Sequence, residues 1–302
     1  MAANRRASVK NVGFVGLGQM GGPMSRNLIK GGFTLRVFDL DPKAVAAVVK
    51  AGATAAKSPK DAATGADVVI TMLPIGAIVE QAVFGQDGSA DGMGKNAFLI
   101  DMSTILPLDT DRIGKRLKER GFAMVDAPVG RTSAAAIEAK STFMVGGSDA
   151  DFVRARPYLE KMGEAIIHCG PLGAGSRMKL VNNYMSCVAN LLTAETLTLA
   201  EACGIEIDTA LEVLRGTPAG RGHINTTWPG KALKDDPKPE FMLDLAFKDL
   251  GLALDTAAQL NVPLATGASA RQMYALARAR GLGRDDWTTA IYRTVRGLAG
   301  RK

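Results

Sequence analysis

The side chain best suited to proton transfer in this sequence is a lysine on a predicted helix. Lys179 is followed by Asn182, Asn183 and Ser186, and at about 100° per residue these four positions share one helical face. The polar face of a surface helix usually carries several charges, whereas this one carries one ammonium group among amides and a hydroxyl. We therefore expect Lys179 to be an acid–base group facing a ligand. The alternative is a solvated surface stripe.

The chemistry open to this lysine is proton exchange with a substrate oxygen. Its ammonium group can hydrogen-bond a carbonyl oxygen and protonate it as hydride reaches the carbon, and the neutral amine is the base in reverse. The ordinary lysine pKa of about 10.4 is high for a base, but burial and a nearby positive charge both lower it. Asn183, one turn further along, is placed to hold the same oxygen.

Histidine offers few alternatives, because the chain has only 2. His168 lies at the end of a predicted strand, and we expect it to be structural. His223 lies in a predicted loop, where it either contacts substrate or has no role in the site.

A second polar cluster follows the predicted strand that ends at Asp126. The sequence there is DAPVGRTS, which places Arg131, Thr132 and Ser133 at the sheet edge where a cofactor is also expected. The guanidinium group of Arg131 offers a fork of donors for an anionic group, and the hydroxyls add further donors. The alternative is a loop with a helix cap and a solvated arginine.

A glycine-rich segment near the N-terminus has the spacing of a dinucleotide-binding turn. The sequence GLGQMG follows the apolar run Val12–Val15 and precedes Pro23–Lys30, which can be helical. Here the first glycine permits a tight turn, the second lets a pyrophosphate approach the backbone, and the third lets helix and strand pack closely. The expected cofactor contacts in this turn are Gly16, Gly18, Gln19, Met20 and Gly21.

An acidic residue at the end of the next predicted strand favours NAD over NADP. Asp39 lies about 20 residues beyond the glycines, where a carboxylate binds the adenosine ribose hydroxyls and repels a 2′-phosphate. Arg36 is the competing signal, although alternation along the strand should point it away from Asp39. A helix cap before Pro42 is the alternative for Asp39.

Further cofactor contacts are expected at other strand ends and in the C-terminal half. Ligands of doubly wound sheets bind outside the carboxyl ends of the strands. Ser103 and Thr104 could also cap a helix near Pro107, and Lys248 could instead pair with Asp244 one turn away. The expected contacts are Met72, Leu73, Pro74, Ser103, Thr104 and Lys248.

The elements that must position these residues form an α/β chain. From residue 9 to about 170, short β-branched runs alternate with helical periodicity, the pattern of βαβ units. We therefore expect an N-terminal Rossmann-type doubly wound sheet in residues 1–171, and an all-α C-terminal domain in residues 172–302, joined by a long interdomain helix. The expected strands are Asn11–Val15, Leu35–Asp39, Val68–Met72, Phe98–Asp101, Ala123–Asp126, Thr142–Val145 and Ile166–Cys169. The expected helices include Ala44–Ala51, Leu108–Arg120, Asp151–Met162, Ser176–Cys203, Ala210–Leu214, Phe241–Gln259 and Ser269–Arg278.

Composition excludes several classes of protein. A length of 302 residues predicts two domains. The net charge of +7 comes from dispersed residues without a basic run, which argues against nucleic acid as a partner. We find no apolar run long enough for a membrane span and no signal peptide, and expect a cytoplasmic protein. The 3 cysteines are far apart, so no metal site is expected.

Together these segments resemble the β-hydroxyacid dehydrogenase family, the 3-hydroxyisobutyrate dehydrogenase-like enzymes. GFVGLGQMG is similar to the family's cofactor motif, DAPV to its substrate motif, GAGSRMKLVNN to its catalytic motif and FKDL to its C-terminal cofactor-contact motif. The resemblance spans nearly the whole chain. It implies an NAD-dependent dehydrogenase in which Lys179 is catalytic, Asn183 binds substrate and Lys248 contacts the cleft.

One segment departs from the family pattern and points to an unusual anion. After DAPV most members carry Ser-Gly-Gly, whereas this chain has Gly130, Arg131 and Thr132. GRTS, NNYMS and GTPAGRGHINTTWP resemble members that use NADH to reduce 3-sulfolactaldehyde to 2,3-dihydroxypropane-1-sulfonate. That resemblance implies that Arg131, Asn182 and Ser186 hold the sulfonate.

Other substrates and other classes of protein stay open at this point. A carboxylate can use two of the same donors, so succinic semialdehyde (4-hydroxybutyrate) and 3-hydroxyisobutyrate are alternative substrates. A non-catalytic dinucleotide-binding protein and an imine reductase are alternative classes, and Lys179 argues against both. The long apolar helix leads us to expect a homo-oligomer, either a dimer or a tetramer.

Overall fold

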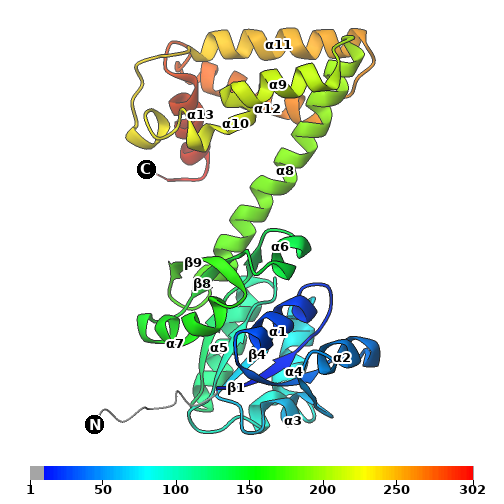
Figure 1. Ribbon diagram of the computed structural model, residues 1–302. Coiled ribbons are helices and arrows are strands. Elements are labelled where there is room, and N and C mark those ends of the chain that lie inside the picture. The colour runs from blue at the N-terminus through cyan, green and yellow to red at the C-terminus, as the bar shows by residue number, and fades with distance from the viewer. Residues whose placement is uncertain (1–9, 302) are drawn as a thin grey trace, which may run out of the picture. The chain divides into compact units, whose positions relative to one another are not determined.

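The computed structural model describes residues 10–301, which fall into two compact units. One ends at Asn183 and contains a β-sheet, and the other begins at Tyr184 and is built from helices. We call them the sheet unit and the helical unit (Figure 1). The predicted boundary lies between residues 171 and 172, whereas the compact units divide within α8 (Ala174–Ala202). The difference arises because the first turns of α8 pack on the sheet unit.

Strands and helices alternate along most of the sheet unit. Its strands are β1 (Asn11–Val15), β2 (Thr34–Phe38), β3 (Thr54–Ala55), β4 (Val68–Thr71), β5 (Phe98–Asp101), β6 (Ala123–Asp126), β7 (Val129–Gly130), β8 (Ser141–Gly146) and β9 (Gly163–Gly170). Its helices are α1 (Gly21–Lys30), α2 (Pro42–Val49), α3 (Pro59–Ala63), α4 (Gly76–Phe84), η1 (Ser89–Asp91), α5 (Pro107–Glu119), α6 (Ser133–Ile137), α7 (Asp149–Leu159) and the first turns of α8.

The sheet has a parallel Rossmann-type half and a mixed half. The strand order is β3-β2-β1-β4-β5-β6-β8-β7, with β9 pairing β8. All neighbours from β3 to β6 are parallel, which confirms the predicted fold class. β8 is antiparallel to β6 and β7, which the sequence did not predict. The order reverses between β1 and β4, the switch point where doubly wound sheets bind ligands.

Both faces of the sheet are covered at its centre, since all residues of β4 and β5 are buried. On β4, Val68 and Ile70 pack in a core with Leu28 of α1. Val69, which points to the other face, packs in a second core with Ile113 of α5. Alternate residues thus feed two apolar layers, as parallel sheets with helices on both sides require.

The predicted elements and the observed ones differ mainly where the elements are short or at their ends. β1, β5 and β6 have the predicted bounds, and β9 begins three residues earlier than predicted, at Gly163 rather than Ile166. β3 and β7 have only 2 residues each and α3 and α6 only 5. Such short elements show no readable periodicity, and the sequence analysis missed them.

In the described residues, the helical unit contains the rest of α8 followed by seven shorter helices and turns of helix, the last of which ends at Leu298. They are α9 (Ile207–Gly216), α10 (Pro218–Arg221), η2 (His223–Asn225), η3 (Ala232–Lys234), α11 (Leu243–Gln259), α12 (Ala265–Ala279) and α13 (Trp287–Leu298). The core cluster of this unit joins α11, α12 and α13 through Leu243, Ala277 and Ala290. α13 was not predicted.

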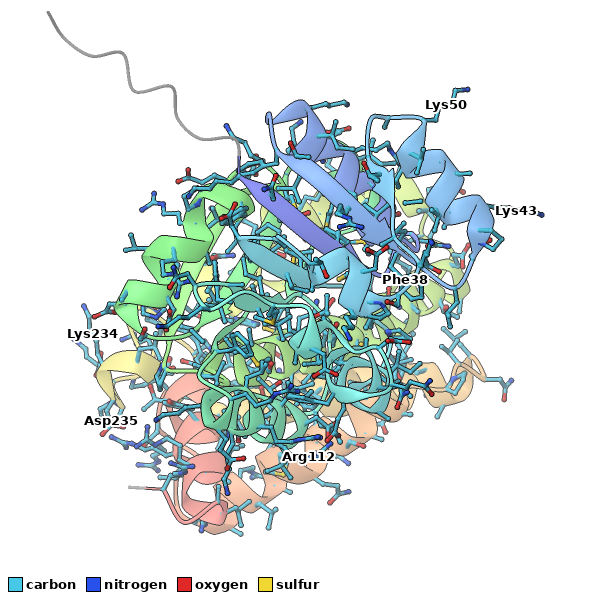
Figure 2. All side chains as sticks on the ribbon, turned by 90° about the horizontal axis from the view of Figure 1, so that it is seen from below. Phe38, Lys43, Lys50, Arg112, Lys234 and Asp235 are labelled. Atoms are coloured by element: carbon cyan, nitrogen blue, oxygen red, sulfur yellow. The ribbon has the colours of Figure 1, made fainter. Side chains whose placement is uncertain are left out.

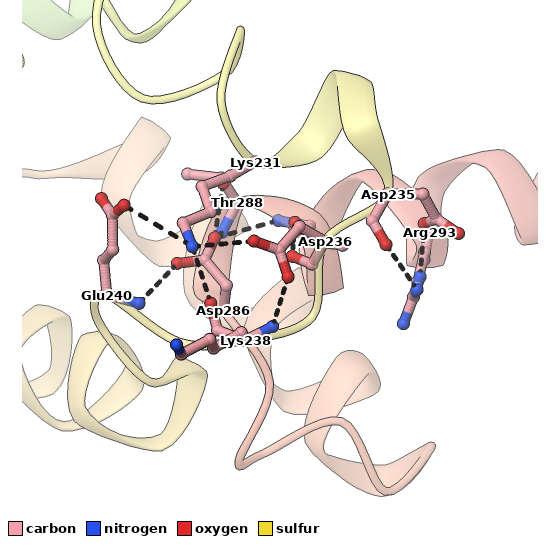
Figure 3. Close-up of polar contacts among 9 residues, drawn as sticks. Lys231, Asp235, Asp236, Lys238, Glu240, Asp286, Thr288 and Arg293 are labelled. Carbon is pink, nitrogen blue, oxygen red and sulfur yellow. Dashed lines mark hydrogen bonds and ion pairs between the residues drawn. The ribbon is translucent and has the colours of Figure 1, made fainter.

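A polar network ties the loop before α11 to the start of α13. Lys231 is only 8% exposed, and its Nζ lies 3.0 Å from Asp236 Oδ2 and 3.0 Å from the carbonyl oxygen of Lys238 (Figure 3). Asp286 caps α13 by accepting the N–H group of Thr288 at 3.0 Å, and its other oxygen accepts the N–H group of Glu240 in the loop at 3.3 Å. These contacts hold residues 231–240 against the end of the helical unit, so the buried lysine has a structural explanation.

Basic side chains are dispersed over separate helices. Lys43 and Lys50 lie on and next to α2, and Arg112 lies on α5 (Figure 2). Arg112 is already paired, at 2.8 Å from both Glu80 and Asp109. Within residues 10–301, none of the helices combines the length and the apolar character that crossing a membrane requires.

Candidate active site

The turn between β1 and α1 is closed at its first and third glycines and open at its second. Gly16 has a φ of 97°, and a Cβ there would lie 2.3 Å from the carbonyl oxygen of Met72. A Cβ on Gly21 would lie 2.0 Å from the carbonyl oxygen of Gly16, whereas a Cβ on Gly18 meets nothing within 4 Å. The first turn of α1 contains no acidic residue. The backbone at Gly18 is therefore accessible, and the positive end of the α1 dipole has no acidic side chain in its first turn. Both features suit a negatively charged pyrophosphate.

Asp39 follows β2 and holds the glycine turn from the side. Its Oδ2 accepts the N–H group of Leu17 at 2.5 Å, and its Oδ1 accepts that of Asp41 at 2.8 Å. The alternative role of Asp39 as a helix cap is wrong, because Asp41 is the N-cap of α2 and accepts the N–H group of Lys43. Asp39 therefore lies at the β1–α1 turn, where sequence reasoning expected a ribose-binding carboxylate.

The ends of β4 and β5 are joined by buried polar contacts. Ser103 is 1% exposed, and its Oγ accepts the N–H group of Leu73 at 2.9 Å. Asp101 Oδ1 accepts from Thr71 Oγ1 at 2.8 Å and from the N–H group of Ser103 at 3.1 Å. Burial raises the pKa of Asp101, while these hydrogen bonds oppose that rise. Ser103 does not cap α5, whose N-cap is Leu106.

These contacts bring most of the predicted cofactor residues to adjoining strand ends. The carbonyl oxygen of Met72 faces Gly16, so the ends of β1 and β4 meet at the switch point. Met72 is partly exposed, and Pro74 and Thr104 are exposed. Ser103 contributes by holding the Leu73 loop, since its own side chain is buried.

The start of α8 is fixed to the sheet unit by a carboxylate. Asp126, the last residue of β6, accepts the N–H group of Gly173 at 2.7 Å and that of Ser176 at 2.6 Å. Ser176 Oγ lies 2.9 Å from Thr110 Oγ1, in a buried contact with α5. Sequence reasoning treated Asp126 only as the first residue of a motif and missed these contacts. The available signal was an acidic residue at a strand end, which does not name its partner.

Lys179 lies on the next turn of α8 and is half-buried. Burial lowers the pKa of its ammonium group, in the direction expected for an acid–base lysine. Asn182 Nδ2 donates to Asn183 Oδ1 at 3.3 Å, so the two amides lie together on α8. Ser186, further along the same helix, is exposed.

Arg131 lies in a conformation that residues other than glycine rarely adopt. Its φ is 73°, and its Nη1 donates to the carbonyl oxygen of Lys140 at 3.0 Å and to Glu164 Oε1 at 2.5 Å. Thr132 caps α6 by accepting the N–H group of Ala135 at 3.4 Å, as the alternative interpretation proposed. The arginine is half-exposed but paired, and sequence reasoning missed its partner Glu164.

Lys248 belongs to the helical unit and pairs with its neighbour in the chain. Its Nζ lies 2.8 Å from Asp249 Oδ1. The alternative pair between Asp244 and Lys248 is wrong, because Asp244 Oδ1 instead accepts from Arg278 Nε at 2.6 Å. The side chain of Lys248 is 60% exposed.

The histidines have local partners. His168 Nε2 lies 2.9 Å from the carbonyl oxygen of Gly147, and its ring stacks on Phe152 at 4.6 Å, which fits the expected structural role. His223 Nδ1 lies 3.1 Å from Thr227 Oγ1. Among the described residues no group of three or more histidine, cysteine, aspartate or glutamate side chains could hold a metal ion.

Two family profiles match adjoining parts of the chain. The NAD binding domain of 6-phosphogluconate dehydrogenase matches residues 11–170. The domain described as NAD-binding of NADP-dependent 3-hydroxyisobutyrate dehydrogenase matches residues 173–295. The expected nicotinamide cofactor is thereby confirmed at the level of NAD(P), and the glycine turn provides an open backbone for its phosphates.

Curated relatives cover almost the whole chain. The 3-sulfolactaldehyde reductase of Escherichia coli (strain K12) is 49% identical over 96% of this chain and 97% of its own length. The 3-hydroxyisobutyrate dehydrogenase of Pseudomonas aeruginosa is 38% identical over 88% of this chain and 91% of its own.

Solved structures agree with this assignment. The 3-hydroxyisobutyrate dehydrogenase of Mycobacterium tuberculosis, solved with L-serine, has a TM-score of 0.67 at 35% identity, covering 95% of this chain and 99% of its own. An imine reductase from Myxococcus stipitatus has a TM-score of 0.85 at 18% identity, covering 95% and 99%, which shows a shared fold alone. The chain therefore belongs to the 3-hydroxyisobutyrate dehydrogenase-like family of NAD(P)-binding oxidoreductases, which act on hydroxyl or aldehyde groups.

Proposed function

We propose that this enzyme uses NADH to reduce 3-sulfolactaldehyde reversibly to 2,3-dihydroxypropane-1-sulfonate. The observation that carries the proposal is Arg131, a cation at the edge of the sheet where most family members have glycine. The 49% identity to the Escherichia coli enzyme named for this aldehyde supports it. A sulfonate has three acceptor oxygens, and a guanidinium fork is suited to bind such a group.

Lys179 is proposed as the acid–base catalyst. The cofactor supplies the hydride to the aldehyde carbon when it is bound. In reduction the ammonium group of Lys179 donates a proton to the carbonyl oxygen, so that the alcohol forms without a free alkoxide. Its partial burial lowers its pKa and eases proton release. Asn183, one turn away and half-buried, is proposed to hold the same oxygen.

The proposed preference for NAD rests on the charges beside the glycine turn. Asp39 places a carboxylate next to the N–H group of Leu17, where the adenosine ribose is expected, and a 2′-phosphate there would be repelled. Arg36 would favour the phosphate, but its guanidinium group is paired with Asp61 of α3. Gly18, Gln19 and the helix N-terminus are proposed to hold the pyrophosphate.

Arg131 is proposed to bind the sulfonate together with neutral donors. Its Nη1 is held by Lys140 and Glu164, while no contact in the described residues occupies Nε or Nη2. Thr132 follows it directly, and Asn182 and Ser186 offer an amide and a hydroxyl on α8. Lys248 is proposed to contact the cofactor, as the family motif FKDL implies.

A homo-oligomer, dimer or tetramer, is also proposed. Along α8, apolar or aromatic side chains are exposed, including Val181 at 62%, Tyr184 at 75% and Leu191 at 52%. Exposed apolar surface of this extent is typical of protein interfaces. Sedimentation at several protein concentrations measures the state, and a monomer at micromolar concentration would contradict this part of the proposal.

The substrate is tested by NADH oxidation with matched aldehydes. The panel contains 3-sulfolactaldehyde, succinic semialdehyde, methylmalonate semialdehyde and the uncharged glyceraldehyde, each with wild type and Arg131→Ala. We expect the highest kcat/KM with 3-sulfolactaldehyde and a loss of about 100-fold in the variant, typical of a deleted charged contact. The kcat/KM for glyceraldehyde should change by less than about two-fold.

Two outcomes would contradict this proposal. A carboxylated aldehyde as the best substrate would favour the 3-hydroxyisobutyrate-type activity of the Pseudomonas relative. An equal loss with all four aldehydes would remove the anion-binding role of Arg131.

A further inference from the structure

Asp126 is a fully buried carboxylate whose hydrogen bonds go to the helix that carries Lys179. It is 0% exposed. One carboxylate oxygen accepts the N–H group of Gly173 at 2.7 Å, and the other accepts that of Ser176 at 2.6 Å. The first N–H groups of a helix lack partners within the helix, and a negative charge there is favoured by the helix dipole. Asp126 therefore serves as the N-terminal cap of α8, although it lies 47 residues before Gly173.

The backbone around this carboxylate leaves it little room to move. A Cβ on Gly146 would lie 2.3 Å from Asp126 Oδ1. A Cβ on Gly175 would lie 2.2 Å from the carbonyl oxygen of Met144 and 2.9 Å from Asp126 Oδ2. Glycine at both positions lets the start of α8 lie directly against the ends of β6 and β8. The carboxylate is thus clamped between a strand end and a helix start.

The position of this clamp relative to Lys179 gives it a consequence for catalysis. Lys179 follows Ser176 by three residues, less than one helical turn, so any rotation or shift of the first turn moves the lysine with it. Two acceptor oxygens fix both the height and the rotation of that turn, which one acceptor cannot do. An error of about 1 Å in a reacting group can cost about 100-fold in rate.

We propose that Asp126 is a positioning residue that sets the place of the Lys179 ammonium group. The inference rests on the proposed function, because it takes Lys179 as the proton donor. Asp126 itself needs no contact with substrate or cofactor. Its role differs from that of an ordinary cap, since the effect of losing it appears in proton transfer as well as in stability.

The test is Asp126→Asn, which keeps the size of the side chain but replaces one acceptor oxygen by an NH2 group facing a backbone N–H. The matched control is Asp111→Asn, which makes the same change in a residue of α5 that contacts the same turn of α8 through Arg177. Asp111 binds Arg177 from outside, at 2.6 and 3.1 Å, in an exposed pair. Both variants are assayed per folded site, counted by titration with NADH.

We expect Asp126→Asn to lower kcat by 10- to 100-fold, with KM and the NADH dissociation constant within about two-fold. The pH at which kcat for reduction falls should also shift, because the surroundings of the ammonium group change. Asp111→Asn should leave all of these within about two-fold. A kcat per folded site and a pH profile equal to those of wild type in Asp126→Asn would overturn the proposal.

A variant that fails to fold does not leave the proposal open. Asp126→Ser, which keeps one buried acceptor in a smaller side chain, is then measured in the same way. If neither variant binds NADH as a folded protein, Asp126 is a folding residue and the positioning role is rejected. Lys179→Met in parallel separates the two proposals: turnover retained there contradicts the lysine mechanism, whereas turnover lost there but kept in Asp126→Asn contradicts only the inference.

Discussion

The part of the sheet edge that is proposed to bind the cofactor (the cofactor edge) and the part proposed to bind the substrate (the substrate edge) are built in different ways. At the ends of β1 and β4 the important surfaces are backbone: Gly16 and Gly21 allow close approach, and Gly18 leaves open space. At the ends of β6 and β7 the important groups are charges, Asp126 beneath α8 and Arg131 beside Glu164. A site made from backbone suits a ligand that does not change, which is the case for the dinucleotide proposed to bind there. A site made from side chains can be changed one residue at a time to suit a new substrate.

The largest effect that should separate the two edges is that of Lys179→Met. Removing the proposed proton donor should lower kcat by about 10³-fold, within the usual range for general acid–base catalysis, while NADH still binds with wild-type affinity. Turnover and fluorescence titration of NADH measure the two quantities. Arg177→Met is the matched control two residues away, because its guanidinium group pairs with Asp111 on the surface. It should retain wild-type kcat within about two-fold.

The proposed role of Lys179 predicts opposite pH dependences for reduction and for oxidation. With Lys179 as the proposed proton donor, reduction needs its ammonium form. The kcat for reduction should therefore fall as pH rises through the pKa of Lys179, while kcat for oxidation of the alcohol should rise. Because burial lowers that pKa, both transitions should lie below the ordinary lysine value of about 10.4. Their absence from the residual activity of Lys179→Met would support the assignment, and their persistence would contradict it.

A smaller effect, confined to the cofactor edge, is expected from Gly18→Ala. The added Cβ meets no protein atom within 4 Å, so thermal stability should not change. It would project into the space proposed for the pyrophosphate, and the dissociation constant for NADH should rise about 10-fold, equivalent to about 1.4 kcal/mol. Gly94→Ala is the matched control, since its Cβ also meets nothing. Equal NADH affinity in the two variants would show that the dinucleotide does not approach this turn.

The same contrast explains what could be predicted from the sequence. The glycine turn and the acidic residue after β2 lie within one βαβ unit, so their spacing is readable along the chain, and Asp39 does contact Leu17. The contacts of Asp126 with Ser176 and of Arg131 with Glu164 span 50 and 33 residues. They depend on the mixed half of the sheet, whose two-residue strand β7 and antiparallel pairs no periodicity indicated.

Glu164 provides the finest test of the substrate edge, with the smallest expected effect. Its carboxylate lies 2.5 Å from Arg131 Nη1, and both side chains are about half exposed, at 49% and 46%. The carboxylate offsets part of the positive charge offered to an anionic substrate, but solvent screens exposed pairs and limits the effect. Glu164→Gln should therefore lower KM for 3-sulfolactaldehyde about two- to three-fold, more at low salt than at high salt.

The control for this change is Glu160→Gln, which neutralises a carboxylate paired with Arg156 on the surface at 2.7 Å. It makes the same change in net charge but leaves Arg131 and its partner intact. An equal decrease in KM in both variants would assign the effect to the overall charge of the protein. An increase in KM with Glu164→Gln would mean that Glu164 chiefly holds the guanidinium group in its binding orientation. A decrease in KM with Glu164→Gln but not with Glu160→Gln would instead show that Glu164, as well as Arg131, adjusts the proposed substrate site to the charge of its ligand.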